Sequence, residues 1–316
     1  MKTIQEAAEF LRQHDNYLIL THRRPDGDTI GSAAALCMGL QAMGKQAELF
    51  PNSQFGGNFS ALTWGLTGSG DPAGKTVISV DLASESLLPY NTPGMAGKIV
   101  FALDHHGSNT HFAAQDLVVP TAAACGEIVL DVLDELGVDL DKGMAEALYV
   151  AISTDTGCFR FSNVTPATYR AAARCLEAGA DTAYWNQLLF LTKSKARLQV
   201  EAYLAQHVEF FADGRIALCL LPQSVVNELG ATEDDLDNVS DYARSISGVE
   251  FGALLRDVSD GAKISARCYE PWDASAVCAL MGGGGHPAAA GATVPGSLED
   301  GRMALLKALR QFGAEV

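Results

Sequence analysis

The pattern of apolar and polar positions predicts that strands and helices alternate through the first half of the chain. Short apolar runs occur in "NYLILTH", "KQAELF", "KTVISVD" and "KIVFALDHH", with helix-forming stretches such as "GSAAALCMGLQAMG" between them. The N-terminal stretch predicts a short amphipathic helix, and a long helical pattern covers residues 122–151. This alternation is typical of βαβ units. We therefore expect an α/β fold whose N-terminal domain is a doubly wound, mainly parallel sheet.

The pattern changes in the last third of the chain. Residues 165–180 and 184–207 have helical patterns, and the latter would suit a hinge. "GRIALCLLP" and "VEFGALLRDVSDGAKISARCY" then predict strands, with a hairpin turn at "SDGAK" where Gly261 allows a positive φ. A helix over 273–281, the run "GGGGHPAAAG", a strand and a helix follow. We expect a catalytic domain over 1–185, a helical linker over 186–208 and a smaller α/β domain over 209–316, with the active-site cleft between the domains.

Composition narrows the function classes. The chain has 316 residues, 48% of them hydrophobic and 19% charged, which is an ordinary globular mixture. No apolar run approaches the roughly 20 residues that span a bilayer, and the N-terminus lacks the features of a signal peptide. We therefore expect a cytoplasmic protein that does not bind membranes.

The charge and the cysteines exclude further classes. A formal charge of −16 argues against gripping long duplex DNA through a basic face, although bound cations and a few arginines can still attract an anionic substrate. The seven cysteines are odd in number and form no CxxC pair. This argues against a disulfide framework and against a thiolate zinc site.

Acidic side chains and histidines follow the predicted strands. Asp81 ends "KTVISVD", Asp104 ends "KIVFALDHH", and "THRRPDGD" follows the first strand. The carboxyl ends of parallel strands share one edge of a sheet, where ligands bind. Singly, a PDGD segment is most often a turn, and an aspartate at a strand end is most often a helix cap. Jointly, four acidic loops at one edge favour a site, which includes His22, Asp26, Asp28, Asp81, Asp104, His105, His106 and Asp155.

Clustered carboxylates repel one another unless cations occupy the cluster. Two divalent cations carry four positive charges, which balance the carboxylates of Asp26, Asp28, Asp81 and Asp155. A ligand set of carboxylates and imidazoles without thiolate suits manganese or a similar six-coordinate ion, with Mg²⁺ and Co²⁺ as alternatives. A two-metal site of this kind serves hydrolysis of a phosphate ester by metal-activated water.

Two C-terminal features are candidate substrate contacts. "GGGGHPAAAG" is either a flexible connector or a loop whose backbone amides approach a phosphate, with His286 as a further donor and Pro287 starting a helix or turn. In "AKISARCY", Lys263, Ser265 and Arg267 alternate, so on a strand they share one face, which is either solvated or binds substrate. Arg267 could fork onto a phosphate. Arg160 is a weaker candidate of the same kind.

The motifs "THRRPDGDTIGS", "SVD", "DHH" and "TDTGCFRFSN" resemble those of the DHH phosphoesterase family, and "KISAR" with "GGGGHPAAAG" resembles its DHH-associated C-terminal domain. These features span residues 22–291 and agree best with the soluble oligoribonuclease and pAp-phosphatase type. The resemblance implies a binuclear manganese site. One metal would take His22, Asp26, Asp81 and Asp155, and the other would take Asp28, Asp81, His105 and Asp155.

The resemblance also implies the remaining roles. Asp104 would orient a neighbouring histidine, and His106 would lie by the scissile phosphate. Arg267 and the loop of Gly283, Gly284, Gly285 and His286 would hold the far end of a short single-stranded RNA or DNA oligonucleotide or a nucleotide. A homodimer is compatible with the resemblance. The alternatives are a soluble phosphodiesterase for cyclic or linear dinucleotides, then a RecJ-like exonuclease or a non-catalytic nucleotide-binding module.

Overall fold

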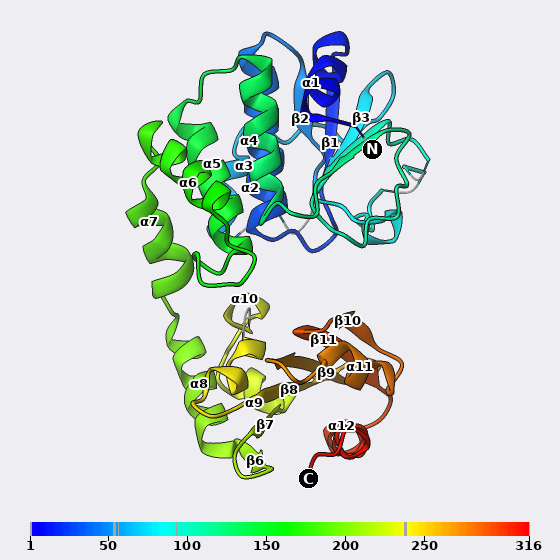
Figure 1. Ribbon diagram of the computed structural model, residues 1–316, viewed down its shortest axis with the longest axis vertical. Coiled ribbons are helices and arrows are strands. Elements are labelled where there is room, and N and C mark those ends of the chain that lie inside the picture. The colour runs from blue at the N-terminus through cyan, green and yellow to red at the C-terminus, as the bar shows by residue number, and fades with distance from the viewer. Residues whose placement is uncertain are drawn as a thin grey trace. The chain divides into compact units, whose positions relative to one another are not determined.

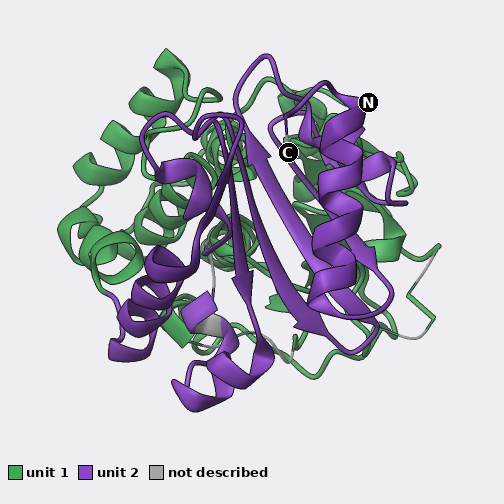
Figure 2. Cartoon of the chain, turned by 90° about the horizontal axis from the view of Figure 1, so that it is seen from below, with its two compact units in different colours: residues 1–192 green, residues 193–316 purple. Residues whose placement is uncertain are grey.

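The structure is a computed structural model that describes residues 2–52, 55, 57–92, 94–95, 97–236 and 239–315. The chain forms two compact units, residues 1–192 and 193–316 (Figures 1 and 2). Each unit contains one sheet. Among the described residues, none of the helices combines the length and the apolar character that crossing a bilayer requires.

The N-terminal sheet is fully parallel, as the sequence predicts. Its strands are β1 (Tyr17–Leu20), β2 (Ala47–Leu49), β3 (Thr76–Val80), β4 (Phe101–Asp104) and β5 (Asp116–Val118). The strand order is β2-β1-β3-β4-β5. After β1 the chain adds β2 on one side, and β3 then lies on the other side of β1, so the order of strands reverses between β1 and β3. Such a reversal opens a crevice at the carboxyl ends of the two flanking strands. The segments that follow β1 and β3 carry Asp26, Asp28 and Asp81.

The two faces of this sheet are covered differently. Helices α1 (Ile4–Gln13), α2 (Gly27–Ala42), α4 (Cys125–Leu136) and α5 (Lys142–Asp155) bury one face in a single apolar core. The other face, which includes Leu18 and Leu20, packs against side chains from residues 82–113 and Phe50. Short elements complete the unit: η1 (Gly57–Phe59), α3 (Ser60–Thr63), η2 (Glu85–Leu87), α6 (Pro166–Glu177), α7 (Thr182–Asn186) and a π-helix (Gln187–Leu191).

Close packing of α2 on α5 places the start of α2 beside the end of α5. A Cβ atom at Gly31 would lie 2.2 Å from the carbonyl oxygen of Ala147, so only glycine permits this approach. A Cβ at Gly27 would likewise overlap the side chain of Thr154. The start of α2 and the end of α5 are therefore side by side, which brings Asp28 close to Asp155.

Two predicted helices are each interrupted. The helical pattern over 122–151 forms two helices, because Gly137 adopts a left-handed φ of +76° and ends α4. The pattern over 184–207 is also broken. Thr192 is extended, and the Ser194 side chain caps a new helix, α8 (Lys195–His207), by accepting a hydrogen bond from the Arg197 amide.

The C-terminal sheet is mixed. Its order is β10-β11-β9-β8-β7-β6, and only β7 and β8 pair in parallel. The strands are β6 (Glu209–Phe211), β7 (Ile216–Leu221), β8 (Phe251–Val258), β9 (Gly261–Cys268), β10 (Gly284–His286) and β11 (Ala289–Val294). Helices α11 (Ala274–Ala279) and α12 (Leu298–Gln311) share a core with one face. On the other face, β7 and β8 are covered by α8, α9 (Gln223–Glu228), α10 (Glu233–Leu236), η4 (Val239–Asp241) and η5 (Ala243–Ser245).

The glycine-rich run is a β-hairpin and not a loop or connector. Gly284, Gly285 and His286 form β10 and pair with β11, and Pro287 begins the turn between the two strands. The predicted hairpin turn between β8 and β9 is present, with Gly261 at φ +142°. On β9 buried and half-buried residues alternate, so Lys263, Ser265 and Arg267 share the less buried face.

Candidate active site

Three groups of metal-ligating side chains meet at the carboxyl edge of the N-terminal sheet. They are His22, Asp26 and Asp81; Asp28, His105 and Asp155; and Asp81, His105 and His106, and within each group the ligand atoms lie within 4.8 Å of one another. These side chains follow β1, β3 and β4 or lie at the ends of α2 and α5 that meet there. The structure thus brings together every residue that the sequence analysis named as a metal ligand.

Asp81 lies between two histidines. Its Oδ2 atom is 3.7 Å from Nε2 of His22, and its Oδ1 atom is 3.5 Å from Nε2 of His105. The two oxygens of one carboxylate therefore face different imidazoles. Around them, Asp26 Oδ1 lies 3.6 Å from the same His22 nitrogen, and Asp155 Oδ2 lies 3.5 Å from the same His105 nitrogen.

The backbone and burial of Asp81 are costly without a cation. Its φ is +55°, a left-handed conformation that aspartate and asparagine tolerate better than most residues. The side chain is 2% exposed, and its Oδ1 atom has no hydrogen-bond partner among the described residues. Burial, together with the charges of Asp28, Asp26 and Asp155, holds the pKa of Asp81 well above its ordinary value.

Asp28 is fixed by the start of another helix. Its Oδ2 accepts a hydrogen bond from the Cys125 amide at 2.7 Å, and its Oδ1 accepts from the Gly126 amide at 3.0 Å and from Ser32 Oγ at 2.8 Å. The N-cap residue of α4 is Ala124, which has no side-chain acceptor of its own. Asp28 therefore caps α4 and lies at its positive end. Burial still outweighs these contacts and raises the pKa of Asp28 well above its ordinary value.

Asp26 and Asp155 are set at the ends of helices. Asp26 is the N-cap of α2, where its Oδ1 accepts hydrogen bonds from the amides of Asp28 and Thr29, both at 3.1 Å. It therefore is a helix cap and also lies among the proposed ligands. The nearby His22 imidazole and the hydrogen bonds from the Thr29 and Asp28 amides hold the pKa of Asp26 below its ordinary value. Burial raises the pKa of Asp155.

Backbone and carboxylate contacts orient the two histidines of the "DHH" motif. His105 Nδ1 is 3.2 Å from the carbonyl oxygen of Ala122, which can only accept, so Nδ1 carries a proton and the other nitrogen, Nε2, has the lone pair that could bind a cation among the carboxylates. His106 Nδ1 lies 2.7 Å from Oδ1 of the fully buried Asp104. The other oxygen of Asp104 accepts from Asn109 Nδ2 at 2.5 Å. The hydrogen bond with Asp104 raises the pKa of His106, which favours the imidazolium.

These donors fit divalent cations. Hard carboxylate oxygens converge from four aspartates, imidazole nitrogens complete the set, and one buried carboxylate oxygen lacks any other partner. The repulsion that raises the pKa values of Asp28 and Asp81 is what bound cations would relieve. The group of His22, Asp26 and Asp81 shares no residue with the group of Asp28, His105 and Asp155. Asp81 belongs to the first group, and its Oδ1 atom lies 3.5 Å from Nε2 of His105 in the second.

The predicted substrate contacts lie elsewhere. Arg160 is exposed in the turn after Asp155, where its Nε donates to the Gly157 carbonyl. The others belong to the C-terminal unit: Lys263, Gly283, Gly284, Gly285, His286 and Arg267. Arg267 pairs with Ala289, which pairs with His286, so these three side chains form a row across neighbouring strands.

Comparison with known proteins decides the family. The model of the DHH family, N-terminal domain, matches residues 16–152, and the DHHA1 domain model matches residues 218–315. The bifunctional oligoribonuclease and PAP phosphatase NrnA of Thermus thermophilus is 33% identical over 306 residues, which cover 93% of this chain and 89% of that protein. The chain belongs to the DHH family. It is a phosphoesterase, an enzyme of the hydrolase class.

Two further proteins are similar to this DHH protein, one in sequence and one in fold. The cyclic-di-AMP phosphodiesterase GdpP of Bacillus subtilis is 27% identical over 308 residues, which cover 88% of this chain but 45% of GdpP. A crystal structure of an exopolyphosphatase-related protein from Bacteroides fragilis has the same fold, with a TM-score of 0.85 at 23% identity over 98% of this chain and 96% of that chain.

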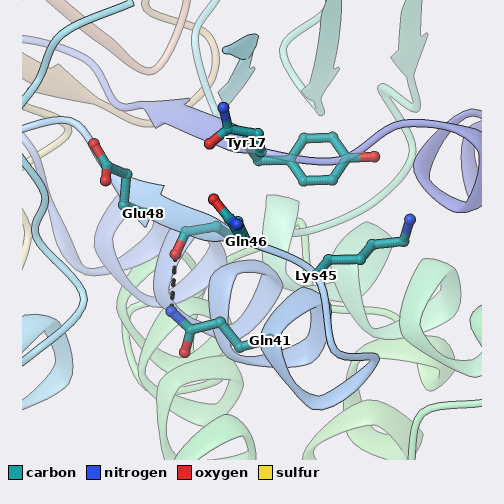
Figure 3. A pocket seen from close by; sticks show the side chains of 7 residues that line it. Tyr17, Gln41, Lys45, Gln46 and Glu48 are labelled. Carbon is teal, nitrogen blue, oxygen red and sulfur yellow. Dashed lines mark hydrogen bonds between the residues drawn. The ribbon is translucent and has the colours of Figure 1, made fainter. Parts of the chain in front are cut away.

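A cavity at the opposite edge of the sheet does not carry the chemistry of this DHH protein. It has a volume of about 260 Å³ and is lined by residues at the amino ends of β1 and β2, among them Tyr17, Gln46 and Glu48 (Figure 3). Gln41 Nε2 donates to the Ala47 carbonyl at 2.8 Å, and Lys45 Nζ donates to the Arg12 carbonyl at 2.9 Å. The local backbone thus takes up these donors, whereas the proposed ligands follow the carboxyl ends of the strands.

The sequence analysis missed several residues that hold the DHH ligands in place. They are Ser32, Asn109, the amides of Cys125 and Gly126, and Asn163, whose Nδ2 donates to the backbone carbonyls of Ala123 and Asp155. Each acts through a contact that the linear pattern does not show. The small residues "ACG" at 124–126, opening a helical pattern without a capping side chain, were the one usable signal.

Proposed function

We propose that this DHH phosphoesterase uses two divalent cations, preferably Mn²⁺, to hydrolyse short oligonucleotides and 3′-phosphoadenosine 5′-phosphate (pAp). The observation that carries the proposal is the position of Asp81, whose two oxygens face two separate histidines, each with further carboxylates around it. A single carboxylate placed in this way suits a bridge between two cations. Phosphoester hydrolysis is the chemistry that such a pair supports best.

The proposed ligand sets are those that the family resemblance implies. His22, Asp26, Asp81 and Asp155 would hold one cation, and Asp28, Asp81, His105 and Asp155 the other. When bound, the pair would activate a water molecule and offset charge on the phosphoryl oxygens. The hydrogen bonds from α4 to Asp28 and from α2 to Asp26 hold these carboxylates in position before any cation binds.

His106 would act on the substrate. Asp104 fixes its Nδ1 atom, which leaves Nε2 to contact the scissile phosphate. Because its pKa is raised, His106 is a good hydrogen-bond donor to a phosphoryl oxygen and a source of a proton for the leaving oxygen. Asp104 contacts His106 and not the phosphate, so it is a positioning residue.

The C-terminal domain would hold the other end of the substrate. Arg267, His286 and Lys263 supply positive charge or donors, Gly284 and Gly285 lie in β10 at the edge of the same sheet, and Gly283 precedes β10. Arg160 would add a contact near the catalytic edge. A few localised phosphate contacts suffice for a short strand, which agrees with a formal charge of −16. The similarity to the oligoribonuclease and PAP phosphatase of Thermus thermophilus supports this substrate class.

A second candidate is hydrolysis of cyclic or linear adenine dinucleotides. It is favoured by the similarity to the cyclic-di-AMP phosphodiesterase GdpP, which extends over both domains of this chain. The two candidates share the catalytic edge and differ in what the C-terminal domain accepts.

The decisive experiment measures turnover with Mn²⁺ of pAp, a short RNA of two to five residues, linear pApA and cyclic di-AMP, side by side. We expect pAp and the short RNA to be the best substrates by kcat/KM. Preference for cyclic di-AMP would establish the second candidate. If all four, and a generic aryl phosphodiester, survive with metal bound, the proposal fails.

Arg267→Ala separates binding from chemistry. We expect a large rise in KM for nucleotides and a smaller effect on the aryl phosphodiester, which has no far end to hold. Equal losses on both substrates would contradict the assignment of Arg267 as a substrate contact.

A further inference from the structure

One face of the C-terminal sheet is only partly covered. Residues that pair directly on neighbouring strands project to the same face. The register therefore places on one face a set that we call the shelf: Lys263, Ser265 and Arg267 on β9, Ala289 and Gly291 on β11, and Gly284 and His286 on β10. These residues are half-buried or exposed. A Cβ atom at Gly284 would meet nothing within 4 Å, so open space lies above that strand.

The shelf ends where η4 and η5 cover the sheet. On β8, Leu254 pairs with Ser265 but is buried in a core that includes Val239 of η4 and Ala243 of η5. Gly252 pairs with Arg267, and a Cβ atom there would lie 2.5 Å from the backbone nitrogen of Arg244. The backbone of Arg244 therefore rests on β8 directly beside Arg267.

A single carboxylate oxygen joins the two arginines at this border. Asp241 Oδ1 lies 3.2 Å from Nη2 of Arg244 and 3.2 Å from Nε of Arg267. The Arg244 guanidinium also lies over the ring of Tyr269, 5.1 Å from its centre, and that ring is 56% exposed. The side chains of the two arginines are 19% and 26% exposed, so water reaches the cluster.

We propose that the Arg244–Arg267 pair binds a terminal phosphate and that Asp241 is an internal counterion that competes with this phosphate for both arginines. In the free protein one oxygen of its carboxylate contacts both guanidiniums. A dianionic phosphate on the end of a substrate displaces it and takes its place, with Arg244 and Tyr269 as further contacts. The proposal rests on the proposed function, because it names the end group that the C-terminal domain reads.

Charge explains why a terminal phosphate should bind to this pair better than a phosphodiester. Two guanidiniums and one carboxylate leave a net charge of +1. A phosphodiester carries one negative charge, so exchanging it for the carboxylate gains no attraction. A terminal phosphate carries close to two negative charges at neutral pH, and its oxygens can accept from both arginine forks. Either phosphate must displace the same carboxylate, so Asp241 lowers the affinity for both of them.

The test is equilibrium binding to the full chain kept in EDTA, where the acidic edge holds no cations to attract phosphate. The probes are adenosine 5′-monophosphate, its phosphate methyl ester and adenosine, measured by titration calorimetry. We expect the wild type to bind the monophosphate best and adenosine least. In Asp241→Asn, affinity for both phosphates should rise by about three- to tenfold, and affinity for adenosine should not change.

Two further variants complete the test. Arg244→Gln should lower the affinity for adenosine 5′-monophosphate by about tenfold and leave the affinity for adenosine unchanged. Glu209→Gln is the matched control, because Glu209 forms an ion pair with Arg302 at 2.7 Å in the same domain but away from the shelf. This variant should leave the affinity for all three probes unchanged.

Each other outcome overturns the inference. A fall in phosphate affinity in Asp241→Asn would make Asp241 a scaffold for Arg267, and unchanged affinity would mean that phosphate binds elsewhere. A matching gain for adenosine would show that the substitution does not act through the phosphate. These results are independent of turnover, so a chain that binds as expected but hydrolyses nothing with Mn²⁺ would contradict the proposed function alone.

Discussion

Asp28 on α2 caps the helix that begins 97 residues later at Cys125, through a hydrogen bond of 2.7 Å from the Cys125 amide. This carboxylate therefore has a structural task besides its proposed place at a cation. Asp155, the last residue of α5, is about a third exposed and caps nothing. The two residues are both proposed ligands, yet their contacts with the rest of the domain are different.

Asp28→Ala and Asp155→Ala should consequently separate stability from activity. Both should abolish Mn²⁺-dependent turnover. Asp28→Ala leaves two buried amides without an acceptor, and should lower the free energy of unfolding by about 2 kcal/mol. Asp155→Ala removes one charge from a repulsive cluster and should leave the stability in EDTA equal or higher. Urea denaturation of both variants checks this, and equal destabilisation would contradict the capping role of Asp28.

The raised pKa of Asp81 predicts how pH acts on the protein without cations. A carboxyl group whose pKa is higher in the folded than in the unfolded state stabilises the fold at low pH, and this contribution is lost as pH rises through the folded-state pKa. In EDTA, Asp81→Asn should therefore stabilise the protein by about 1 kcal/mol near pH 8 and much less near pH 5. Asparagine also tolerates the left-handed backbone.

Denaturation of wild type and Asp81→Asn at both pH values measures this difference. The same variant should lose turnover with Mn²⁺, because the amide cannot bridge two cations. A variant that is less stable than the wild type near pH 8 would show that the buried Asp81 charge is compensated within the protein.

The contact between Asp104 and His106 predicts a shift in the titration of the histidine. Asp104→Asn removes the charge that holds the pKa of His106 above its ordinary value, so the pKa should fall. NMR titration of the imidazole in EDTA measures this directly. In the Mn²⁺-loaded enzyme kcat should drop by about 10- to 100-fold while bound Mn²⁺ is retained. A variant with an unchanged His106 pKa and full kcat would remove the positioning role.

Two neighbouring glycines of the hairpin should respond differently to alanine. At Gly283 a Cβ atom would lie 2.1 Å from the Gly291 carbonyl oxygen, whereas at Gly284 it would meet nothing within 4 Å. Gly283→Ala should therefore destabilise the C-terminal domain by about 1–3 kcal/mol. Gly284→Ala should leave stability unchanged and raise KM for nucleotides, because the added methyl group stands where the substrate approaches. An unchanged KM in a stable Gly284→Ala would place the substrate elsewhere.

Much of this architecture is predictable because it depends on local pattern. The apolar runs that end in His22, Asp81 and Asp104 define three parallel strands, and parallel strands necessarily share their carboxyl edge. The face shared by Lys263 and Arg267 follows from the two-residue period of a strand.

The remainder depends on contacts between distant residues. Strands β5, β6 and β10 have three residues each, too few for a period, and β10 is glycine-rich, so only pairing with β11 makes it a strand. The cap of α4 by Asp28 and the link from Asp241 to Arg267 likewise join segments whose sequences carry no sign of each other.

The most direct test of the account is a Mn²⁺ titration of the initial rate of pAp hydrolysis by the EDTA-stripped full chain, with Asp81→Asn measured in parallel. The account predicts no turnover without Mn²⁺, saturable activation with about two ions bound per chain at full activity, and no activation of Asp81→Asn. Turnover in EDTA, or activation of Asp81→Asn comparable with the wild type, would contradict a cation-dependent site built around Asp81.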